Sequence, residues 1–153
     1  MALYIPREVF SAMHAHAEVA YPEECCGLLI SDRGSDASAF AAANSRKKIT
    51  ESIRMKNAYE GPKRDRYNID PLELFKADRA ISQKGLTIAG IYHSHPDHPA
   101  SLSKFDLEHS FPWYSYVIIS VPKGRAGDTK SWITGDDRKS AFQEGIEILG
   151  QEK

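Results

Sequence analysis

The spacing of apolar and polar residues alternates along the chain between the helical and the strand pattern. A short apolar stretch at residues 3–5 predicts a strand, and apolar residues then recur three or four positions apart from Pro6 to Ala20. This spacing predicts a helix over residues 6–20, because proline suits the first helical turn and side chains three or four apart share one face.

A second helix is predicted to begin after Asp70. Asp70 can cap the first turn, Pro71 fits that turn, and Glu73 can reach back to the backbone amide of the cap. Gly85 is expected to end the helix. Its predicted apolar face consists of Leu72, Phe75, Ala80 and Ile81.

Short apolar or alternating segments predict further strands, over residues 25–30, 39–44, 49–55, 86–92, 114–121 and 131–135. The last two should pair antiparallel, because a glycine-containing connection joins them. Residues 136–149 are predicted to form a final helix that carries Ala141, Phe142, Ile146 and Leu149. Strands interspersed with two or three helices indicate a single mixed α/β domain over residues 1–153.

Residues 56–67 are polar, contain Gly61 and Pro62, and show neither helical nor strand spacing. A loop of this length is uncommon without a role, so it is interpreted either as a flap over a site or as a solvated surface connection. The loop carries three basic residues, Lys63, Arg64 and Arg66.

The composition narrows the possible classes of function. The 153 residues include 20 basic and 21 acidic side chains, a formal net charge of -1, which does not favour a nucleic-acid partner. Neither a signal peptide nor an apolar stretch long enough to span a membrane is visible, so a cytoplasmic protein is expected. Cys25 and Cys26 are adjacent and cannot pair without strain, which favours buried, inert thiols.

Two histidines follow the strand predicted over residues 86–92. Because residues two apart in a strand share a face, His93 and His95 should point to the same side, with Ser94 opposite. Pro96 then ends the strand, and sites in α/β proteins tend to lie at the carboxyl ends of strands. Two neutral imidazoles placed side by side are suited to bind zinc.

A third ligand is predicted a few residues further on. Ser103 can cap a short helix whose first turn carries Asp106, and the intervening residues can fold this carboxylate back over the histidines. Two histidines and an aspartate with an open fourth position are typical of catalytic zinc, since structural sites fill all four positions with protein. Asp97 and His98 are alternative ligands by residue type.

A zinc hydrolase also needs a group that carries a proton to the leaving amine. Glu24 lies beside the predicted strand at residues 25–30, which is a candidate neighbour of residues 86–92. A glutamate at the edge of a core can have its pKa raised by desolvation, as this task requires. Glu24 is therefore the candidate general acid/base, with the adjacent Glu23 as an alternative.

Together these residues resemble the JAMM (MPN+) metallopeptidases of the Mov34/MPN/PAD-1 family. The family pattern is an upstream glutamate, then H-x-H-P, a spacer and S-x-x-D, which stands here as Glu24, residues 93–96 and residues 103–106. The likeness to the small bacterial branch, which resembles sulfur-carrier-protein peptidases, covers residues 3–149.

The resemblance implies a curved mixed β-sheet packed between helices, similar to cytidine deaminases. It implies one zinc ion held by His93, His95 and Asp106, with zinc-bound water as nucleophile, Glu24 as general acid/base and Ser103 as a stabiliser of the oxyanion. The implied reaction is hydrolysis of a peptide or isopeptide bond after the C-terminal Gly-Gly of a ubiquitin-like sulfur-carrier protein.

Two other classes of function are an interaction module and a deaminase. A non-catalytic MPN-type interaction module is the alternative, but relatives of that kind lose the metal set, which is intact here. Zinc-dependent deamination couples H-x-E to a later P-C-x-x-C, and the chain contains no C-x-x-C.

Overall fold

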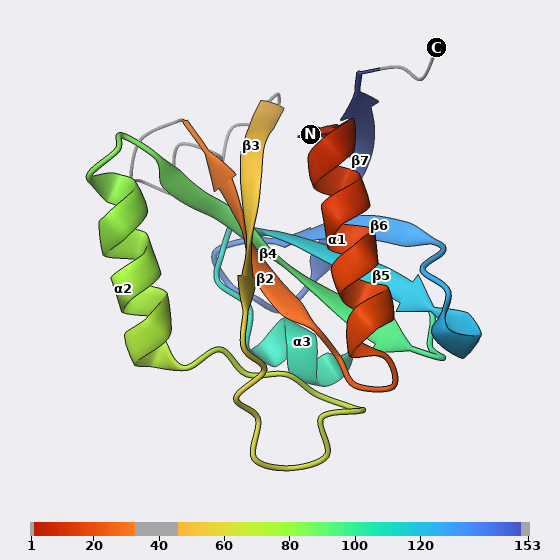
Figure 1. The fold of residues 1–153 in the computed structure, drawn as a ribbon. Coiled ribbons are helices and arrows are strands. Elements are labelled where there is room, and N and C mark those ends of the chain that lie inside the picture. Colours follow the sequence, from red (N-terminus) through yellow and green to blue (C-terminus); the bar gives the residue numbers. More distant parts are fainter. Residues whose placement is uncertain (1, 33–45, 151–153) are drawn as a thin grey trace.

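A computed structural model of the chain describes residues 2–32 and 46–150, which contain seven strands and three α-helices (Figure 1). The strands are β1 (Ala2–Pro6), β2 (Cys26–Ser31), β3 (Arg46–Met55), β4 (Thr87–Pro96), β5 (Ser115–Val121), β6 (Thr129–Thr134) and β7 (Ala141–Leu149). The helices are α1 (Arg7–Ala20), α2 (Pro71–Ser82) and α3 (Lys104–Glu108), with a 3-10 turn η2 (Pro122–Gly124). None of these helices is long and apolar enough to cross a membrane.

The strands join in the order β1-β3-β2-β4-β5-β6-β7, and β1 closes the ring by pairing with β7. β1 runs parallel to β3 and β7, and β4 runs parallel to β5, whereas the other neighbours are antiparallel. The predicted mixed α/β architecture is confirmed, and the closure of the sheet into a barrel is an additional feature. The likeness to cytidine deaminases stays a prediction.

Strands β2 and β4 are buried along their whole length, and an apolar cluster packs against each of their faces. Side chains alternate between the two faces of a strand. Leu29 of β2 packs in one apolar cluster with the buried face of α1, whereas its neighbour Leu28 packs in a second cluster with Ile81 of α2. In Figure 1, α2 lies to the left of strands β2 and β4 and α1 lies to their right.

Strand β7 stands where the sequence predicted a helix over residues 136–149, and that prediction is wrong. Ile146 and Ile148 pack against the core two positions apart, as in a strand, while Phe142 is exposed. One half of β7 pairs with β6 and the other half with β1, so it closes the barrel. Gly145 at its centre also disfavours a helix. Partners that are distant in sequence thus override a helix-like spacing of apolar residues.

Helix α2 begins at the predicted place, with Asp70 Oδ1 accepting a hydrogen bond from the Leu72 amide at 3.1 Å. The predicted apolar face is wrong in part, because Leu72 and Phe75 are more than half exposed. The side chains that do contact the core, spaced three or four positions apart, are Leu74, Ala77 and Ile81.

The remaining predictions for single elements agree with the structure where it describes the chain. The strands expected at residues 3–5, 25–30, 49–55, 86–92, 114–121 and 131–135 are all present. The expected strand at residues 39–44 lies outside the described residues. Residues 56–70 connect β3 to α2 without a helix or strand, in agreement with the predicted loop.

Helix α1 carries two histidines that contact different neighbours. His14 Nε2 lies 2.9 Å from Thr129 Oγ1, and His16 Nδ1 lies 2.8 Å from Tyr92 Oη. These histidines contact different neighbours, because residues two apart in a helix do not share a face. Burial, together with the positive charge of Arg54, lowers the pKa of His16 to about 4.

We expect His16 to make the folded protein less stable at acidic pH. Its pKa is about 4 in the folded protein against 6.5 for an ordinary histidine, so between these values the unfolded chain binds the additional proton. The free energy of unfolding therefore rises with pH across this interval. In His16→Gln the rise should be smaller. Urea titrations of the metal-free protein at several pH values measure it, and an unchanged slope would contradict the prediction.

Candidate metal centre

The carboxyl end of β4 places His93 and His95 on one face of the sheet. Ser94 points to the other face, where its Oγ accepts a hydrogen bond from the backbone amide of Cys25 at 2.8 Å. Both histidines are buried, with exposed fractions of 0% and 7%. The alternation along the strand therefore brings the two imidazoles together, as the H-x-H spacing predicted.

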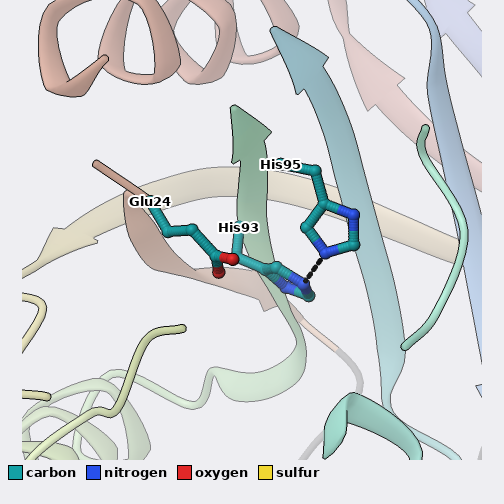
Figure 2. Close-up of side chains that lie close together, drawn as sticks. All are labelled: Glu24, His93 and His95. Atoms are coloured by element: carbon teal, nitrogen blue, oxygen red, sulfur yellow. Dashed lines mark hydrogen bonds between the residues drawn. The ribbon is translucent and has the colours of Figure 1, made fainter. Parts of the chain in front are cut away.

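The pairing of β2 with β4 brings Glu24 to the same place. The register aligns Cys26 with His93, and the Ser94 amide donates to the Cys25 carbonyl at 3.2 Å, which continues the pairing by one step. The next step sets Glu24 opposite the second histidine, and opposite residues of antiparallel strands share a face. Figure 2 shows Glu24 and the two histidines pointing toward one another.

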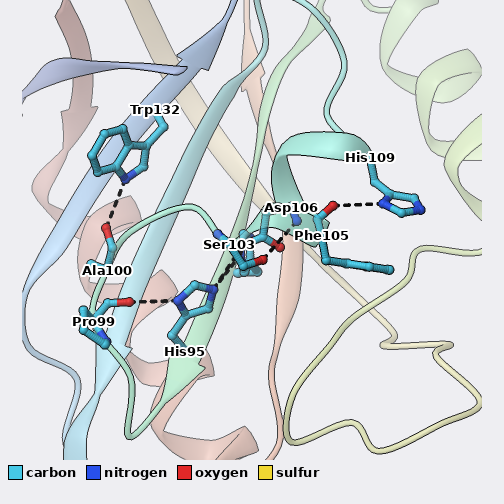
Figure 3. Close-up of polar contacts among 9 residues, drawn as sticks. His95, Pro99, Ala100, Ser103, Phe105, Asp106, His109 and Trp132 are labelled. Atoms are coloured by element: carbon cyan, nitrogen blue, oxygen red, sulfur yellow. Dashed lines mark hydrogen bonds and ion pairs between the residues drawn. The ribbon is translucent and has the colours of Figure 1, made fainter. Parts of the chain in front are cut away.

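The loop after β4 determines which nitrogen of His95 is free to bind a metal. Nδ1 of His95 lies 2.8 Å from the Pro99 carbonyl oxygen, and a carbonyl only accepts, so Nδ1 carries the proton (Figure 3). Nε2 of His95 therefore keeps its lone pair, as metal binding requires. Nδ1 of His93 has no hydrogen-bond partner among the described residues. The ring of Tyr67 stacks on His93 instead, with centroids 4.5 Å apart.

Two further side chains hold this loop through its backbone. Trp132 Nε1 donates to the Ala100 carbonyl at 3.0 Å (Figure 3), and Ser120 Oγ donates to the His98 carbonyl at 2.6 Å. Sequence reasoning missed both residues. They lie on β6 and at the end of β5, and no local pattern marks a side chain that acts on a loop so far away in sequence.

Helix α3 turns Asp106 back toward the histidines. Ser103 Oγ accepts from the Asp106 amide at 3.0 Å, while the Ser103 amide donates to Asp106 Oδ2 at 3.1 Å. This reciprocal capping box fixes the start of the helix and the orientation of the carboxylate together. The predicted short helix with Ser103 at its cap is therefore present.

The three predicted ligand atoms form a triangle of the size that tetrahedral zinc requires. The Nε2 atoms of His93 and His95 are 3.2 Å apart, and each lies 3.3 Å from Asp106 Oδ2. In a tetrahedron with bonds of about 2.0 Å, the ligand atoms are separated by about 3.3 Å. The residues present thus fit a zinc ion with one open position, although zinc itself stays a prediction.

The charges of the centre suit a cation. Burial alone would raise the pKa of Asp106, but the adjacent imidazoles of His93 and His95 and the hydrogen bond from the Ser103 amide outweigh burial and hold this pKa well below its usual range. Burial lowers the pKa of His93 and so keeps that ring neutral. An ionised carboxylate and a neutral imidazole are the forms in which these side chains bind metal.

Glu24 is a carboxyl in a different environment. Burial, followed by the negative charges of Asp106 and Asp65, raises the pKa of Glu24 to about 9, so this carboxyl holds a proton at neutral pH. Its Oε1 atom is buried without a hydrogen-bond partner among the described residues. A carboxyl that is buried, protonated and unpaired has the properties of a proton carrier.

Glu24 is also a second candidate for the third ligand, because its carboxylate and the two histidines together could hold a metal ion. The ligand atoms of these three residues lie within 4.8 Å of one another. Asp106 is favoured over Glu24, because its Oδ2 is only 3.3 Å from each imidazole and its pKa is lowered rather than raised.

The alternative ligands Asp97 and His98 are both exposed, unlike the three predicted ligands. Both carboxylate oxygens of Asp97 accept hydrogen bonds elsewhere, Oδ2 from the Tyr21 hydroxyl at 2.7 Å and Oδ1 from the Lys123 amide at 2.7 Å. His98 is exposed at the rim of a cleft beside the centre. Neither residue therefore displaces Asp106 as the predicted ligand.

The cysteines and Glu23 also stand apart from the predicted ligand set. Cys25 and Cys26 are buried and unpaired, as expected. Burial raises the pKa of Cys25 to about 11 and that of Cys26 to about 12, so both remain neutral thiols. Glu23, the alternative to Glu24, is exposed.

Comparison with known proteins identifies the class that this fold and centre define. Residues 6–134 match the family described as prokaryotic homologs of the JAB domain. The chain therefore belongs to this family, and the predicted membership of a JAMM-like peptidase family is confirmed.

Several relatives carry the names of enzymes. A Thermus thermophilus protein named probable TtuB-protein conjugate cleaving protease is 31% identical over 126 residues, covering 82% of this chain and 75% of the relative. A desampylase of Haloferax volcanii is 37% identical over 117 residues, with coverage of 76% and 73%. The CysO-cysteine peptidase of Mycobacterium tuberculosis is 30% identical over 150 residues, with coverage of 97% and 92%. These names agree with the predicted class of enzyme, a peptidase.

Solved structures share the fold. A protein from Desulfitobacterium hafniense aligns with a TM-score of 0.77 and 27% identity, and one from Salinibacter ruber aligns with a TM-score of 0.67 and 31% identity. Each alignment covers 99% of this chain and 94% of the solved chain. The arrangement of strands and helices is therefore common to relatives over almost the whole chain.

We expect Asp106→Asn to lose stable metal binding. Asparagine keeps the shape of the side chain but removes the negative charge that a zinc ligand supplies. Loss of a direct ligand should weaken zinc affinity by more than the roughly 10- to 100-fold that changes in the surrounding hydrogen bonds cost. Zinc content per chain, measured by atomic emission after dialysis against a weak chelator, should fall from one to near zero.

Glu24→Gln is the matched control, because it makes the same change in the other buried carboxyl. It should keep its zinc. If Glu24→Gln lost zinc while Asp106→Asn retained it, the assignment of the two carboxyls would be reversed.

Proposed function

We propose that this chain is a zinc-dependent peptidase that hydrolyses a bond after the C-terminal Gly-Gly of a ubiquitin-like sulfur-carrier protein. One observation carries the proposal, which is the convergence of two imidazoles and Asp106 at 3.2–3.3 Å beside a buried Glu24 with a raised pKa. A single JAMM domain over residues 1–153 would perform the reaction.

Glu24 is the proposed proton carrier. The positive charge of a bound zinc ion would lower the pKa of Glu24 from its raised value. Glu24 could then take a proton from the attacking water and return it to the leaving amine. A zinc ion bound by the predicted ligands would lower the pKa of the attacking water and polarise the scissile carbonyl. The Pro99 carbonyl supports this arrangement, because it holds His95 in the tautomer whose Nε2 can bind the metal.

Ser103 is the proposed stabiliser of the oxyanion. Its Oγ uses one lone pair to accept from the Asp106 amide, which leaves the hydroxyl hydrogen available to donate. Ser103 also lines the cleft beside Glu24 and His95. A hydroxyl at this wall can donate to the negative charge that develops on the substrate carbonyl oxygen.

A cleft with a volume of about 410 Å³ gives a substrate access to the centre. Its lining includes Glu24, Arg66, His95, Ser103 and Phe105. The tail of a small protein is the proposed substrate because the relatives are named a probable TtuB-protein conjugate cleaving protease and a CysO-cysteine peptidase. Two glycines at the end of such a tail have no side chains to exclude them from a confined cleft.

We expect Glu24→Gln to abolish turnover without loss of zinc. General acid–base catalysis contributes about 100- to 10,000-fold, so kcat should fall within that range. The substrate is a sulfur-carrier protein that bears residues beyond Gly-Gly, and the intact mass of that protein reports whether the tail is removed. Both enzymes are loaded with zinc before the assay.

Two outcomes would contradict this proposal. Equal turnover by Glu24→Gln would remove Glu24 from the mechanism. No cleavage by the zinc-loaded unmutated protein would favour another tail or a binding role of the MPN type.

We expect the basic residues of the loop at 56–67 to attract the substrate. Arg66 lines the cleft, and its guanidinium carbon lies 4.2 Å from the centre of the Phe105 ring. Neutralising Lys63, Arg64 and Arg66 together should raise KM and weaken its dependence on salt. Steady-state kinetics at several salt concentrations measure both effects. Kinetics that respond to salt as in the unmutated protein would limit these charges to a structural role.

A further inference from the structure

The loop between β3 and α2 is closed at its base by the side chain of Asn57. Oδ1 of Asn57 accepts hydrogen bonds from the backbone amides of Tyr59 at 3.0 Å and Asn68 at 3.2 Å. Next to these bonds, the Ala58 amide donates to the Asn68 carbonyl at 2.8 Å. These bonds join the two ends of residues 57–68 into a compact surface loop.

The amide nitrogen of the same side chain bonds to Glu24. Nδ2 of Asn57 donates to the Glu24 carbonyl at 3.0 Å and to the Arg66 carbonyl at 3.0 Å. A side-chain amide has two N–H donors and two carbonyl lone pairs, and Asn57 uses all four. A flipped amide group would place Nδ2 against the two backbone amides and Oδ1 against the two carbonyls, so only this orientation forms the four hydrogen bonds.

The other polar group of the Glu24 backbone is bound by the same loop. The Glu24 amide donates to the carbonyl of Lys63, in the middle of the loop, at 2.8 Å. The loop therefore holds both the N–H and the C=O group of Glu24. On the C-terminal side, the next amide, that of Cys25, is held by Ser94 of β4.

The carboxyl of Glu24 lacks comparable support. Its Oε1 atom is buried with no hydrogen-bond partner among the described residues. The place of this carboxyl in the centre therefore depends on the backbone from which the side chain extends. A displacement of about 1 Å in a reacting group can lower a rate about 100-fold.

We propose that Asn57 is a positioning residue for Glu24 and that residues 57–68 form the clamp through which it acts. Asn57 does not line the cleft, so its effect on the reaction would pass through the backbone of Glu24. The inference rests on the proposed function of Glu24 as the proton carrier. The role of the loop would be to hold the backbone of Glu24 in place.

Asn57→Asp tests the clamp with a side chain of the same shape. One carboxylate oxygen can still accept from the amides of Tyr59 and Asn68, so the base of the loop is kept. The other oxygen faces the carbonyls of Glu24 and Arg66 and has no hydrogen to donate, so attraction is replaced by repulsion. If this variant does not fold, Asn57→Ala carries the same measurements, because it removes the bonds without adding repulsion.

Two measurements distinguish positioning from a general loosening of the protein. Amide hydrogen exchange, followed by NMR, should be at least about tenfold faster at Glu24 in Asn57→Asp, while the amides of β4 keep their protection. With the zinc-loaded enzymes and a sulfur-carrier protein that bears a tail beyond Gly-Gly, kcat should fall about 100-fold. Zinc content should change little, because the predicted ligands are untouched. The fall in kcat should exceed any rise in KM, because Arg66 loses a backbone hydrogen bond but keeps its charge at the cleft.

Asp70→Ala is the matched control for a loss of stability alone. It removes another hydrogen bond between a side chain and a backbone amide, at the start of α2 rather than beside Glu24. Exchange at Glu24 and kcat should both stay as in the unmutated protein.

Unchanged exchange at Glu24 in Asn57→Asp would overturn the clamp, whatever the substrate is. Faster exchange with unchanged kcat would overturn the positioning role. Failure of the unmutated protein to cleave the tail would contradict the proposed function instead, and the exchange measurement would still decide whether Asn57 holds the Glu24 backbone.

Discussion

The antiparallel pairing of β2 with β4 is the constraint on which the candidate centre depends. It aligns Cys26 with His93 and thereby sets Glu24 on the face that carries the two imidazoles. A slip of one residue would turn Glu24 to the opposite face and bring Cys25 to the centre, because side chains alternate along a strand. Both strands are buried over their whole length, so an apolar cluster on each face holds the register. The same packing that stabilises the fold therefore brings together residues that are about 70 positions apart in the sequence.

Two carboxyls stand in this centre, and their surroundings give them opposite properties. Asp106 accepts hydrogen bonds from the Ser103 amide and faces both imidazoles, which together keep its pKa low despite burial. Glu24 is desolvated without such partners at Oε1, and its pKa is raised. An ionised carboxylate suits a metal ligand and a protonated one suits a proton carrier, so the environments alone separate the two proposed roles. Ser103 contributes to this separation because the capping box that starts α3 also orients the Asp106 carboxylate.

The parts of the centre that were predictable from sequence are those whose geometry is local. The shared face of His93 and His95 follows from the two-residue period of a strand, and the orientation of Asp106 follows from a capping box four residues long. The side chains that hold the surrounding loops, such as Trp132 and Asn57, act across the fold and leave no local pattern. The error at β7 has the same origin, because that segment is a strand only by virtue of its pairing with β1 and β6. Local spacing specifies a side chain's direction, whereas the identity of its neighbours depends on the tertiary structure.

The sequence left residues 56–67 open to two interpretations, a flap over the site or a solvated surface connection. The loop at residues 57–68 is instead hydrogen-bonded to both sides of the Glu24 backbone. A flap that moved as a unit would take with it the carbonyl of Lys63 and the side chain of Asn57, which hold the two sides of the Glu24 backbone. Opening would then displace the proposed proton carrier and lower activity until the loop returned. Conversely, a substrate tail that contacts Arg66 at the cleft would stabilise the closed loop, since the Arg66 carbonyl is bonded to the same Asn57 amide. Binding of a tail at the cleft and the position of Glu24 would then depend on the same hydrogen bonds of Asn57. A bound tail would favour the loop conformation in which the proposed proton carrier is in place.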